Sequence, residues 1–255
     1  MTDPFALGGK HVLITGGSSG LGRFFAETLA ARGARVTVAA RRAEALTKTV
    51  DSIADKKGLA HSVVMDVTVP QSIEGAFDTA EGQFGPVEIL INNAGVTSTR
   101  PALEQDESSW DKVLDTNLKG VWLVAQSAGR RMVAHGAKGS IVNIASILGL
   151  RVGGSVAPYA ISKAGVVQMT KALALEWARH GIRVNALAPG YFETELNDDF
   201  FQGDAGQALI KRIPQRRLGE LRELEGPLLL LASKAGSYMT GAVVVVDGGH
   251  LVSSL

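Results

Sequence analysis

A tyrosine and a lysine one helical turn apart are the side chains best suited to acid–base chemistry in this chain. They belong to the segment YAISK at residues 159–163, where Tyr159 and Lys163 occupy positions i and i+4 of a predicted helix and share one face. A tyrosine hydroxyl has an ordinary pKa of about 10, and a nearby positive charge favours the phenolate, so the pair could exchange a proton near neutral pH. Ser146, which follows a predicted strand, could hydrogen-bond the same substrate oxygen.

A glycine-rich turn, TGGSSGLG at residues 15–22, lies between the first predicted strand and the first predicted helix. Its spacing is Gly-x-x-x-Gly-x-Gly, which differs from the Gly-x-Gly-x-x-Gly of many dinucleotide-binding proteins and lacks the Gly-Lys-Ser/Thr ending of a P-loop. Glycines at this place let the backbone approach a pyrophosphate at the helix N-terminus. A tight structural turn would also explain the glycines, but their position after the first strand favours dinucleotide binding.

The end of the second predicted strand indicates which dinucleotide binds. NAD sites usually place an acidic side chain there, on the adenosine ribose, whereas this chain has Ala40 followed by Arg41 and Arg42. The missing carboxylate removes a repulsion against a 2′-phosphate, and arginine binds phosphate through paired, charge-assisted hydrogen bonds. We therefore expect NADP(H). Arginines on a solvated loop would explain the two basic residues but not the missing acid.

Composition excludes several other classes of protein. The 255 residues include 26 Lys and Arg against 25 Asp and Glu, a balance that does not suit an electrostatic binder of nucleic acid or of a membrane surface. With 45% hydrophobic and 20% charged residues, the chain can bury a large core. It has no cysteine, and its five histidines are scattered without metal-ligand spacing, so we expect no metal site. Without a signal-peptide pattern or an apolar run of roughly 20 residues, we expect a soluble cytoplasmic protein.

Short apolar strands alternate with helical periodicity along the chain, a pattern typical of βαβ units. We predict a Rossmann-type, doubly wound α/β fold with a seven-stranded parallel sheet, in a single domain over residues 1–255. The predicted strands are 11–15, 35–40, 63–67, 87–91, 140–145, 183–187 and 243–246, and the longest predicted helices are 110–133 and 159–179. Residues 191–217 do not follow this alternation, so they are a candidate substrate lid, with a packed surface subdomain or an interface element as equal alternatives.

Taken together, the motifs resemble those of the short-chain dehydrogenase/reductase family. The residues that carry the resemblance are TGGSSGLG at 15–22, Asp66 and Val67, NNAG at 92–95, Asn117, Ser146, YAISK at 159–163 and PGYFET at 189–194. Each motif is weak by itself. Their order and spacing over nearly the whole chain are highly specific.

The resemblance implies roles for the site residues. Tyr159 would be the general acid for ketone reduction, Ser146 would hold the carbonyl oxygen, Lys163 would bind the nicotinamide ribose and lower the pKa of Tyr159, and Asn117 would position a water. Asp66 would contact adenine and Thr194 the nicotinamide carboxamide. The expected cofactor contacts are Gly16, Ser18, Ser19, Gly20, Leu21, Gly22, Arg41, Arg42, Asp66, Val67, Asn93, Ala94, Gly95, Tyr159, Lys163, Pro189, Gly190, Phe192 and Thr194.

The expected activity is NADP(H)-dependent reduction of a ketone, or oxidation of a secondary alcohol. Residues 147–158 and the candidate lid should face the substrate, where Gly149, Gly153 and Gly154 would leave room and the lid phenylalanines suggest an apolar ketone. Arg151 could bind an anionic group if it points inward, although an exposed arginine is the simpler interpretation.

Several alternatives remain open from the sequence. Arg130 and Arg131 could offer a basic patch to an acidic carrier protein, which would suit a β-ketoacyl thioester reductase, but Leu175 stands where a second carrier-facing arginine is expected. A non-catalytic NADP-binding regulator is a further alternative, against which the set Asn117, Ser146, Tyr159 and Lys163 argues. A nucleotide-sugar epimerase would have a different glycine spacing and a longer C-terminal region. The resemblance also implies a tetramer or a dimer, and we predict a homotetramer.

Overall fold

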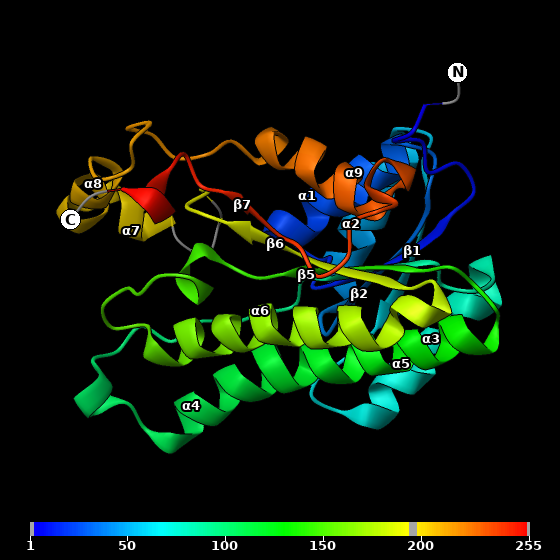
Figure 1. The fold of residues 1–255 in the computed structure, drawn as a ribbon, viewed down its shortest axis with the longest axis horizontal. Coiled ribbons are helices and arrows are strands. Elements are labelled where there is room, and N and C mark those ends of the chain that lie inside the picture. The colour runs from blue at the N-terminus through cyan, green and yellow to red at the C-terminus, as the bar shows by residue number, and fades with distance from the viewer. Residues whose placement is uncertain (1–2, 194–197, 254–255) are drawn as a thin grey trace.

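One parallel sheet organises the computed structural model, which describes residues 3–193 and 198–253. Seven strands within those residues pair in the order β3-β2-β1-β4-β5-β6-β7, so the chain starts near the middle of the sheet and builds toward each edge in turn (Figure 1). The strands are β1 (His11–Thr15), β2 (Arg35–Ala40), β3 (Leu59–Val64), β4 (Ile89–Asn92), β5 (Ser140–Ile144), β6 (Arg183–Pro189) and β7 (Val243–Val246). The predicted doubly wound, seven-stranded parallel fold is confirmed.

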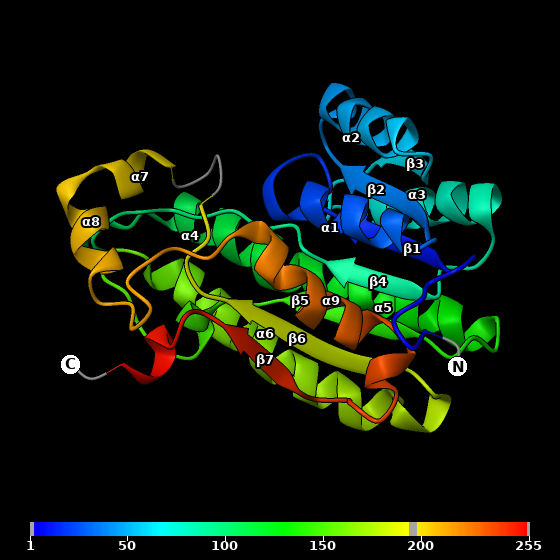
Figure 2. The same cartoon turned by 90° about the horizontal axis from the view of Figure 1, so that it is seen from above.

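Helices cover both faces of this sheet (Figure 2). On one face lie α1 (Gly20–Ala31), α2 (Ala43–Asp55) and α9 (Glu225–Ala232), and on the other lie α3 (Pro70–Phe84), α5 (Val121–Ala134) and α6 (Ala157–Trp177). A large hydrophobic core results on each side of the sheet, and a smaller third cluster forms around Val121 and Val166. Phe25 and Leu228 belong to the first core, and Phe77 and Val124 to the second.

The central strand β1 shows why the strand sequences are continuous runs of apolar residues. All five of its residues are buried. Val12 and Ile14 enter one core, while Leu13, on the opposite face of the pleat, enters the other. A strand covered by helices on both faces therefore needs apolar side chains at successive positions.

The third strand begins and ends earlier than the sequence predicted. It spans Leu59–Val64 rather than 63–67, because its partner β2 ends at Ala40, which pairs with Val64. Beyond that point the chain has no strand to pair with, although Met65 and Val67 are still buried. Burial without pairing made these loop residues look like a strand.

The predicted helix over 110–133 is interrupted. It consists of α4 (Glu107–Leu114), a π-helical segment (Asp115–Gly120) and α5, which run on from one another without a break in the chain direction. The extra residue per turn changes which side chains face the core at that point. Asn117 lies in this π-helical segment and is fully buried.

Residues 191–217 include two short helices, α7 (Asp198–Gln202) and α8 (Asp204–Ile210) (Figure 1). After them, the Gln215 N–H donates to the Gly248 carbonyl at 3.2 Å, just before the C-terminal 3-10 turn His250–Val252. Phe201 and Ile213 anchor the segment, since their side chains are buried. In the described part of the chain, no helix is both long enough and apolar enough to cross a membrane.

Candidate active site

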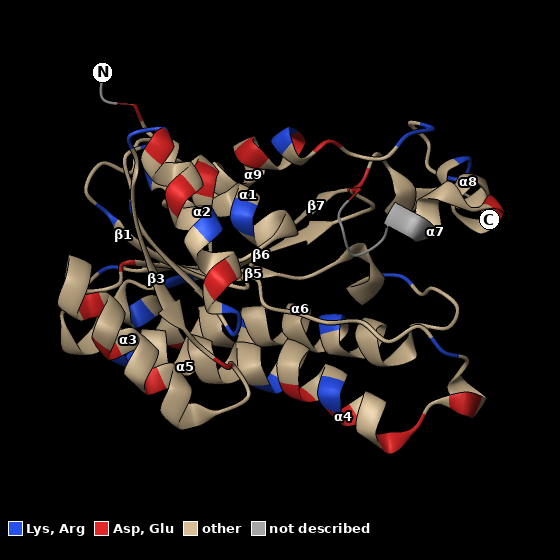
Figure 3. Ribbon diagram, turned by 180° about the vertical axis from the view of Figure 1, so that it is seen from behind, with Lys and Arg blue, Asp and Glu red and all other residues tan. Residues whose placement is uncertain are grey.

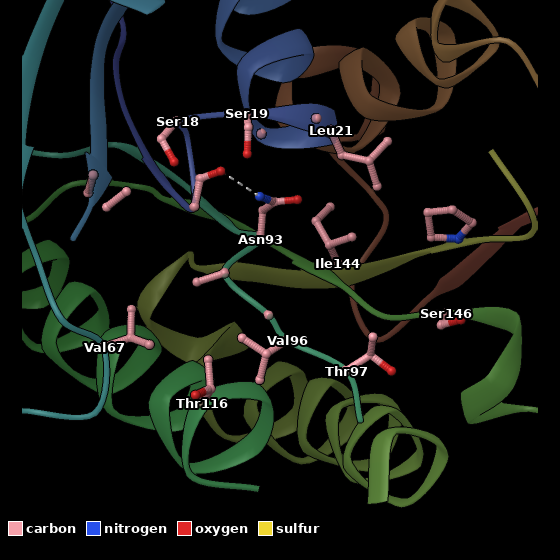
Figure 4. A pocket seen from close by; sticks show the side chains of 18 of the residues that line it. Ser18, Ser19, Leu21, Val67, Asn93, Val96, Thr97, Thr116, Ile144 and Ser146 are labelled. Atoms are coloured by element: carbon pink, nitrogen blue, oxygen red, sulfur yellow. Dashed lines mark hydrogen bonds between the residues drawn. The ribbon is translucent and has the colours of Figure 1, made fainter. Parts of the chain in front are cut away.

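A cavity of about 590 Å³ opens where six of the parallel strands end (Figure 4). This is the edge at which doubly wound sheets bind their ligands, because the loops that follow the strands converge there. It collects these predicted residues: Gly16, Ser18, Ser19, Gly20, Leu21, Gly22, Arg41, Arg42, Asp66, Val67, Asn93, Ala94, Gly95, Ser146, Tyr159, Lys163, Pro189, Gly190 and Phe192. Asn117 lies outside the lining, and Thr194 lies outside the described residues.

The cavity also has walls that the sequence analysis did not predict. They are formed by Ala39, Ala40, Met65, Val96, Thr97, Thr116, Ile144 and Ala145. Each is next to a predicted residue or within three positions of one. These residues could have been predicted from the strand ends alone, because any loop residue that directly follows a strand can line the cavity.

The glycine-rich turn has room for a ligand's phosphates but not for side chains. Gly16 has a φ of +66°, and a Cβ at Gly22 would overlap the Gly16 carbonyl oxygen and lie 2.6 Å from Asn93 Nδ2. Helix α1 begins here with Ser19 as its N-cap, which makes no side-chain capping hydrogen bond, and the first turn has no acidic residue. The free N–H groups and positive end of the helix dipole fit a pyrophosphate in this part of the cavity.

Hydrogen bonds tie the turn to the segment that follows β4. Thr15 Oγ1 accepts from the backbone N–H groups of Asn93 and Ala94, each at 3.0 Å. The Asn93 carboxamide donates back to the carbonyls of Thr15, at 3.0 Å, and Gly16, at 3.2 Å (Figure 4). The loop is thereby held open in one conformation before any ligand binds.

Two basic side chains and one acidic side chain line the end of the cavity near β2. Arg41 and Arg42 are exposed and follow Ala40 directly, so no carboxylate stands at the end of β2. Asp66 accepts hydrogen bonds from the Thr68 hydroxyl, at 2.7 Å, and the Thr68 N–H, at 2.9 Å. These bonds lower the pKa of Asp66, so this carboxylate is charged at neutral pH.

Ser146, Tyr159 and Lys163 meet at the opposite end of the cavity. Ser146 Oγ accepts from the backbone N–H of Leu148 at 3.1 Å and hydrogen-bonds the Tyr159 side chain. The Lys163 ammonium donates to the Ile144 carbonyl at 2.7 Å and lies 5.7 Å from the centre of the Tyr159 ring. The helical spacing of the tyrosine and lysine and the end of β5 thus bring all three side chains to one place.

Burial controls the protonation of this pair. It raises the pKa of Tyr159, an effect that the hydrogen bond from Ser146 offsets only in part, so the direction is opposite to the one expected from the lysine. The ammonium of Lys163 is itself buried, and burial lowers its pKa from 10.5 to about 8. Desolvation penalises both charged forms, the phenolate and the ammonium, and it is the largest cause of both shifts.

Asn117 supports the site from behind. Its Oδ1 accepts from the Val96 N–H at 2.8 Å, and its Nδ2 donates to the Val96 carbonyl at 2.8 Å and to Ser162 Oγ at 3.2 Å. Ser162 in turn donates to the Tyr159 carbonyl at 2.7 Å. This chain fixes the backbone of a cavity-lining residue relative to the helix of Tyr159.

Two expectations about the substrate side need correction. A Cβ at Gly149 would lie 2.7 Å from the backbone carbonyl carbon and oxygen of Lys163, so this glycine allows close packing on α6 and does not make room for substrate. Arg151 is half-buried and hydrogen-bonded to the C-terminal turn, so it is not a freely exposed arginine. Of the lid phenylalanines, Phe192 and Phe201 are buried and Phe200 is exposed.

The basic patch suggested for a carrier protein is largely neutralised. Arg131 forms ion pairs with Glu74, Asp78 and Glu81 of α3, at 2.7 to 2.9 Å, and its guanidinium lies over the Phe77 ring. Acidic and basic residues are interspersed over the helices of this region (Figure 3). Arg131 is therefore committed to an intramolecular contact.

The geometry defines a dinucleotide-binding α/β protein with a half-buried tyrosine and a buried lysine at the reacting end of its cavity. Residues 16–250 match a protein-family model described as enoyl-(acyl carrier protein) reductase. Gluconate 5-dehydrogenase of Gluconobacter oxydans is 38% identical over 252 residues, covering 98% of both chains. Galactitol 2-dehydrogenase of Cereibacter sphaeroides is 39% identical, covering 97% of both chains.

Two further similarities extend this comparison. The 3-oxoacyl-(acyl-carrier-protein) reductase of Escherichia coli is 37% identical, covering 94% of this chain and 97% of its own. A crystal structure of a gluconate 5-dehydrogenase from Burkholderia cenocepacia, in complex with NADP and tartrate, superimposes with a TM-score of 0.95 at 37% identity and covers 99% of both chains.

The chain belongs to the short-chain dehydrogenase/reductase family. It is an NAD(P)-dependent dehydrogenase or reductase that acts on CH–OH groups and the corresponding carbonyls. The non-catalytic alternative considered for the sequence is thereby set aside.

Proposed function

We propose that this enzyme interconverts a ketone and a secondary alcohol on a small polyhydroxylated substrate, with NADP(H) as cofactor and Tyr159 as general acid and base. The observation that carries the proposal is the convergence of Ser146, Tyr159 and Lys163 at one end of a cavity whose other end has a glycine-rich turn. When bound, the cofactor supplies or accepts the hydride. The roles of the protein residues follow from their positions.

Ser146 and Tyr159 act on the substrate oxygen. The Ser146 hydroxyl acts on the Tyr159 hydroxyl, so the two lie close together, and a carbonyl oxygen that enters between them could accept a hydrogen bond from each. During reduction the carbonyl carbon gains hydride and the oxygen takes the Tyr159 proton, and oxidation reverses both transfers. The raised pKa of Tyr159 keeps the proton on the hydroxyl until charge develops on the substrate oxygen.

Lys163 holds a position from which it can stabilise the phenolate that remains. Its ammonium lies 5.7 Å from the Tyr159 ring centre and is anchored by the Ile144 carbonyl. One of its three donors is used in that bond, which leaves others for a cofactor hydroxyl or a water. Asn117 acts as a positioning residue, because both hydrogens of its carboxamide are already donated within the protein.

The preference for NADP(H) is inferred from Arg41 and Arg42. Both line the cavity at the end of β2, where Ala40 replaces the acidic residue that NAD sites use. A 2′-phosphate would meet two guanidinium groups and no carboxylate at that position.

The substrate class is inferred from the relatives named above, whose names specify a sugar acid and a polyol. This inference replaces the apolar ketone suggested by the phenylalanines, since Phe201 packs against Tyr191 and Phe200. We infer that residues 191–217 cover the substrate from the side of β6. Reduction of a carrier-bound thioester is the second candidate, favoured by the family description and the similarity to the 3-oxoacyl reductase.

A direct assay separates these candidates. The purified protein is given NADPH or NADH with 5-keto-gluconate, keto-sugars, small diketones and an acetoacetyl thioester, and oxidation of the cofactor is recorded. We expect turnover of a polyhydroxylated ketone with NADPH, and its loss in Tyr159→Phe. Activity confined to the thioester would favour the second candidate, and undiminished turnover in Tyr159→Phe would contradict the assigned acid.

We also infer that the protein assembles as a homotetramer. Large apolar side chains are exposed on α5 and α6, with Leu175 83% exposed and Trp122 39% exposed, and β7 is an edge strand of the sheet. Buried against a second copy, these surfaces would leave water. Light scattering after size exclusion should give four times the 26.7 kDa chain mass, and a monomer at micromolar concentration would contradict the assembly.

A further inference from the structure

A second group of polar and aromatic side chains lies next to the catalytic residues. Arg151 follows the 3-10 turn Ile147–Gly149 that begins after Ser146, and its Nη1 donates to the His250 carbonyl and, at 3.2 Å, to Ser253 Oγ. This guanidinium therefore connects the segment after β5 to the C-terminal 3-10 turn. Arg151, His250 and Ser253 are not among the residues that line the cavity described above.

Tyr191 connects this group to the catalytic tyrosine. It stands between Gly190 and Phe192, which both line the cavity, and its ring centre lies 5.4 Å from the His250 ring. The Tyr191 phenol is near enough to Tyr159 to contribute to the raised pKa of that group. Burial raises the pKa of Tyr191 itself, and nearby Arg151 opposes this effect. Arg151, Tyr191 and His250 thus form one linked group, here called the wall, which adjoins the cavity lining through Gly190 and Phe192, the neighbours of Tyr191.

The wall has hydrogen-bonding capacity that the protein does not use. Among the side chains of residues 3–193 and 200–253, Arg151 has no carboxylate partner, and its hydrogen bonds to these residues involve Nη1 alone, which leaves the Nε and Nη2 edge. His250 is 6% exposed, and its Nδ1 is buried without a hydrogen-bond partner. Buried polar atoms in folded proteins nearly always have partners, so a partner is expected to come from a ligand or from water.

The charges around the wall favour an anion. Asp247 is the acidic residue that acts on His250, and both of its oxygens accept from backbone N–H groups, Gly249 at 2.8 Å and Leu251 at 2.5 Å. Arg151 and the exposed Arg212 both act on the imidazole as positive charges. Burial lowers the pKa of His250, so the imidazole is neutral at pH 7 and can offer its Nδ1 as a single donor.

We propose that Arg151, assisted by His250, binds a carboxylate of the substrate, so that the enzyme acts on a hydroxy acid or keto acid in preference to a neutral polyol of the same length. The free edge of a guanidinium matches a carboxylate with two parallel hydrogen bonds. Because the wall adjoins Tyr159 through Tyr191, the carboxylate would orient the chain of the substrate relative to the hydroxyl that exchanges a proton. The inference rests on the proposed function for the reacting end of the cavity.

Matched pairs of compounds test it. Gluconate and glucitol differ only in a carboxylate against a hydroxymethyl group, and tartrate and threitol differ in the same way at both ends. Binding of each compound to the protein saturated with NADP⁺ is measured by calorimetry, and oxidation of gluconate and glucitol is followed as kcat/KM. We expect tighter binding of the acid in at least one pair. Arg151→Gln should weaken binding of that acid by on the order of 10- to 100-fold and change binding of its neutral partner by less than about threefold.

Two control variants separate local recognition from other effects. Arg212→Gln removes an equal charge from the same region without touching the C-terminal turn, and Ser253→Ala removes one tether of Arg151 while keeping the guanidinium. Both should retain the preference for the acid. If Arg212→Gln weakens binding of the acid as much as Arg151→Gln does, the preference comes from general electrostatic attraction. If Ser253→Ala weakens it equally, Arg151 serves only to anchor the turn.

The two proposals can fail separately. No preference for the acid in either pair overturns the carboxylate subsite, even if the enzyme oxidises alcohols with NADP⁺. Preferential binding of an acid that depends on Arg151 supports the subsite, even if no alcohol or ketone in the panel turns over and the proposed function fails.

Discussion

Replacing Lys163 with Met should make the protein more stable at neutral pH while abolishing its activity. Lys163 is 4% exposed, and burial lowers its pKa from 10.5 to about 8. A shift of this size means that holding the ammonium in the folded protein costs about 3 kcal/mol. Methionine fills a similar volume without charge, but it leaves the Ile144 carbonyl without its donor, at a cost of about 1 kcal/mol. The expected net gain is about 2 kcal/mol.

The sign of the effect depends on pH. The folded protein holds the Lys163 proton less tightly than the unfolded chain does, so the cost is fully present below pH 8 and is relieved as the pH rises toward 10.5. The advantage of Lys163→Met should therefore be greatest at or below pH 7 and close to zero near pH 10. Thermal unfolding should shift upward by about 4 to 8 °C at pH 7.

Urea and thermal unfolding of both proteins from pH 6 to pH 10, at one protein concentration, measure this difference. Lys171→Met is the matched control, because Lys171 is an exposed lysine on the same helix and its replacement should change stability by less than about 0.5 kcal/mol at any of these pH values. A Lys163→Met protein that is less stable than the wild type at pH 7, or whose gain does not depend on pH, would refute the reasoning from desolvation.

Three other perturbations have defined outcomes. Replacing both Arg41 and Arg42 with Ala should weaken NADPH binding by on the order of 10- to 100-fold and NADH binding far less. Fluorescence titration with each cofactor measures both affinities, and equal losses would contradict the 2′-phosphate assignment. Gly22→Ala should abolish binding of both cofactors, because the new Cβ overlaps the Gly16 carbonyl oxygen; calorimetry with NADPH that finds normal affinity would contradict the tight turn. Arg131→Met should destabilise the fold by about 1 to 3 kcal/mol, because three carboxylates of α3 lose their shared cation. Urea unfolding measures the loss of stability, and unchanged stability would show that these ion pairs contribute nothing.

Much of this molecule could be predicted because its signals are local. The alternation of strands and helices follows from hydrophobic periodicity within each segment, and the order of the segments indicates a parallel, doubly wound sheet. The glycines of residues 15–22 and the spacing of Tyr159 and Lys163 each lie within one turn or one helix. Such motifs identify the two ends of the cavity without reference to any distant contact.

Other features depend on contacts between distant segments, and the sequence analysis missed or misjudged them. The third strand ends where β2 ends, so its boundary is a property of the pair. The π-helical turn at Asn117 satisfies partners in the segment after β4 and in α6. Arg131, interpreted as a docking residue, is bound by acidic residues of α3 more than fifty positions away.

By itself, therefore, the sequence determined the fold class, the family resemblance and the residues that carry the chemistry, since backbone propensity and side-chain spacing act over a few residues. Only the tertiary structure decided how those residues behave. Burial set the direction of the pKa of Tyr159, against the expectation from Lys163, because desolvation depends on everything packed around a group. The same is true of Arg151, whose guanidinium is held by hydrogen bonds to the His250 carbonyl and the Ser253 hydroxyl of the distant C-terminal turn.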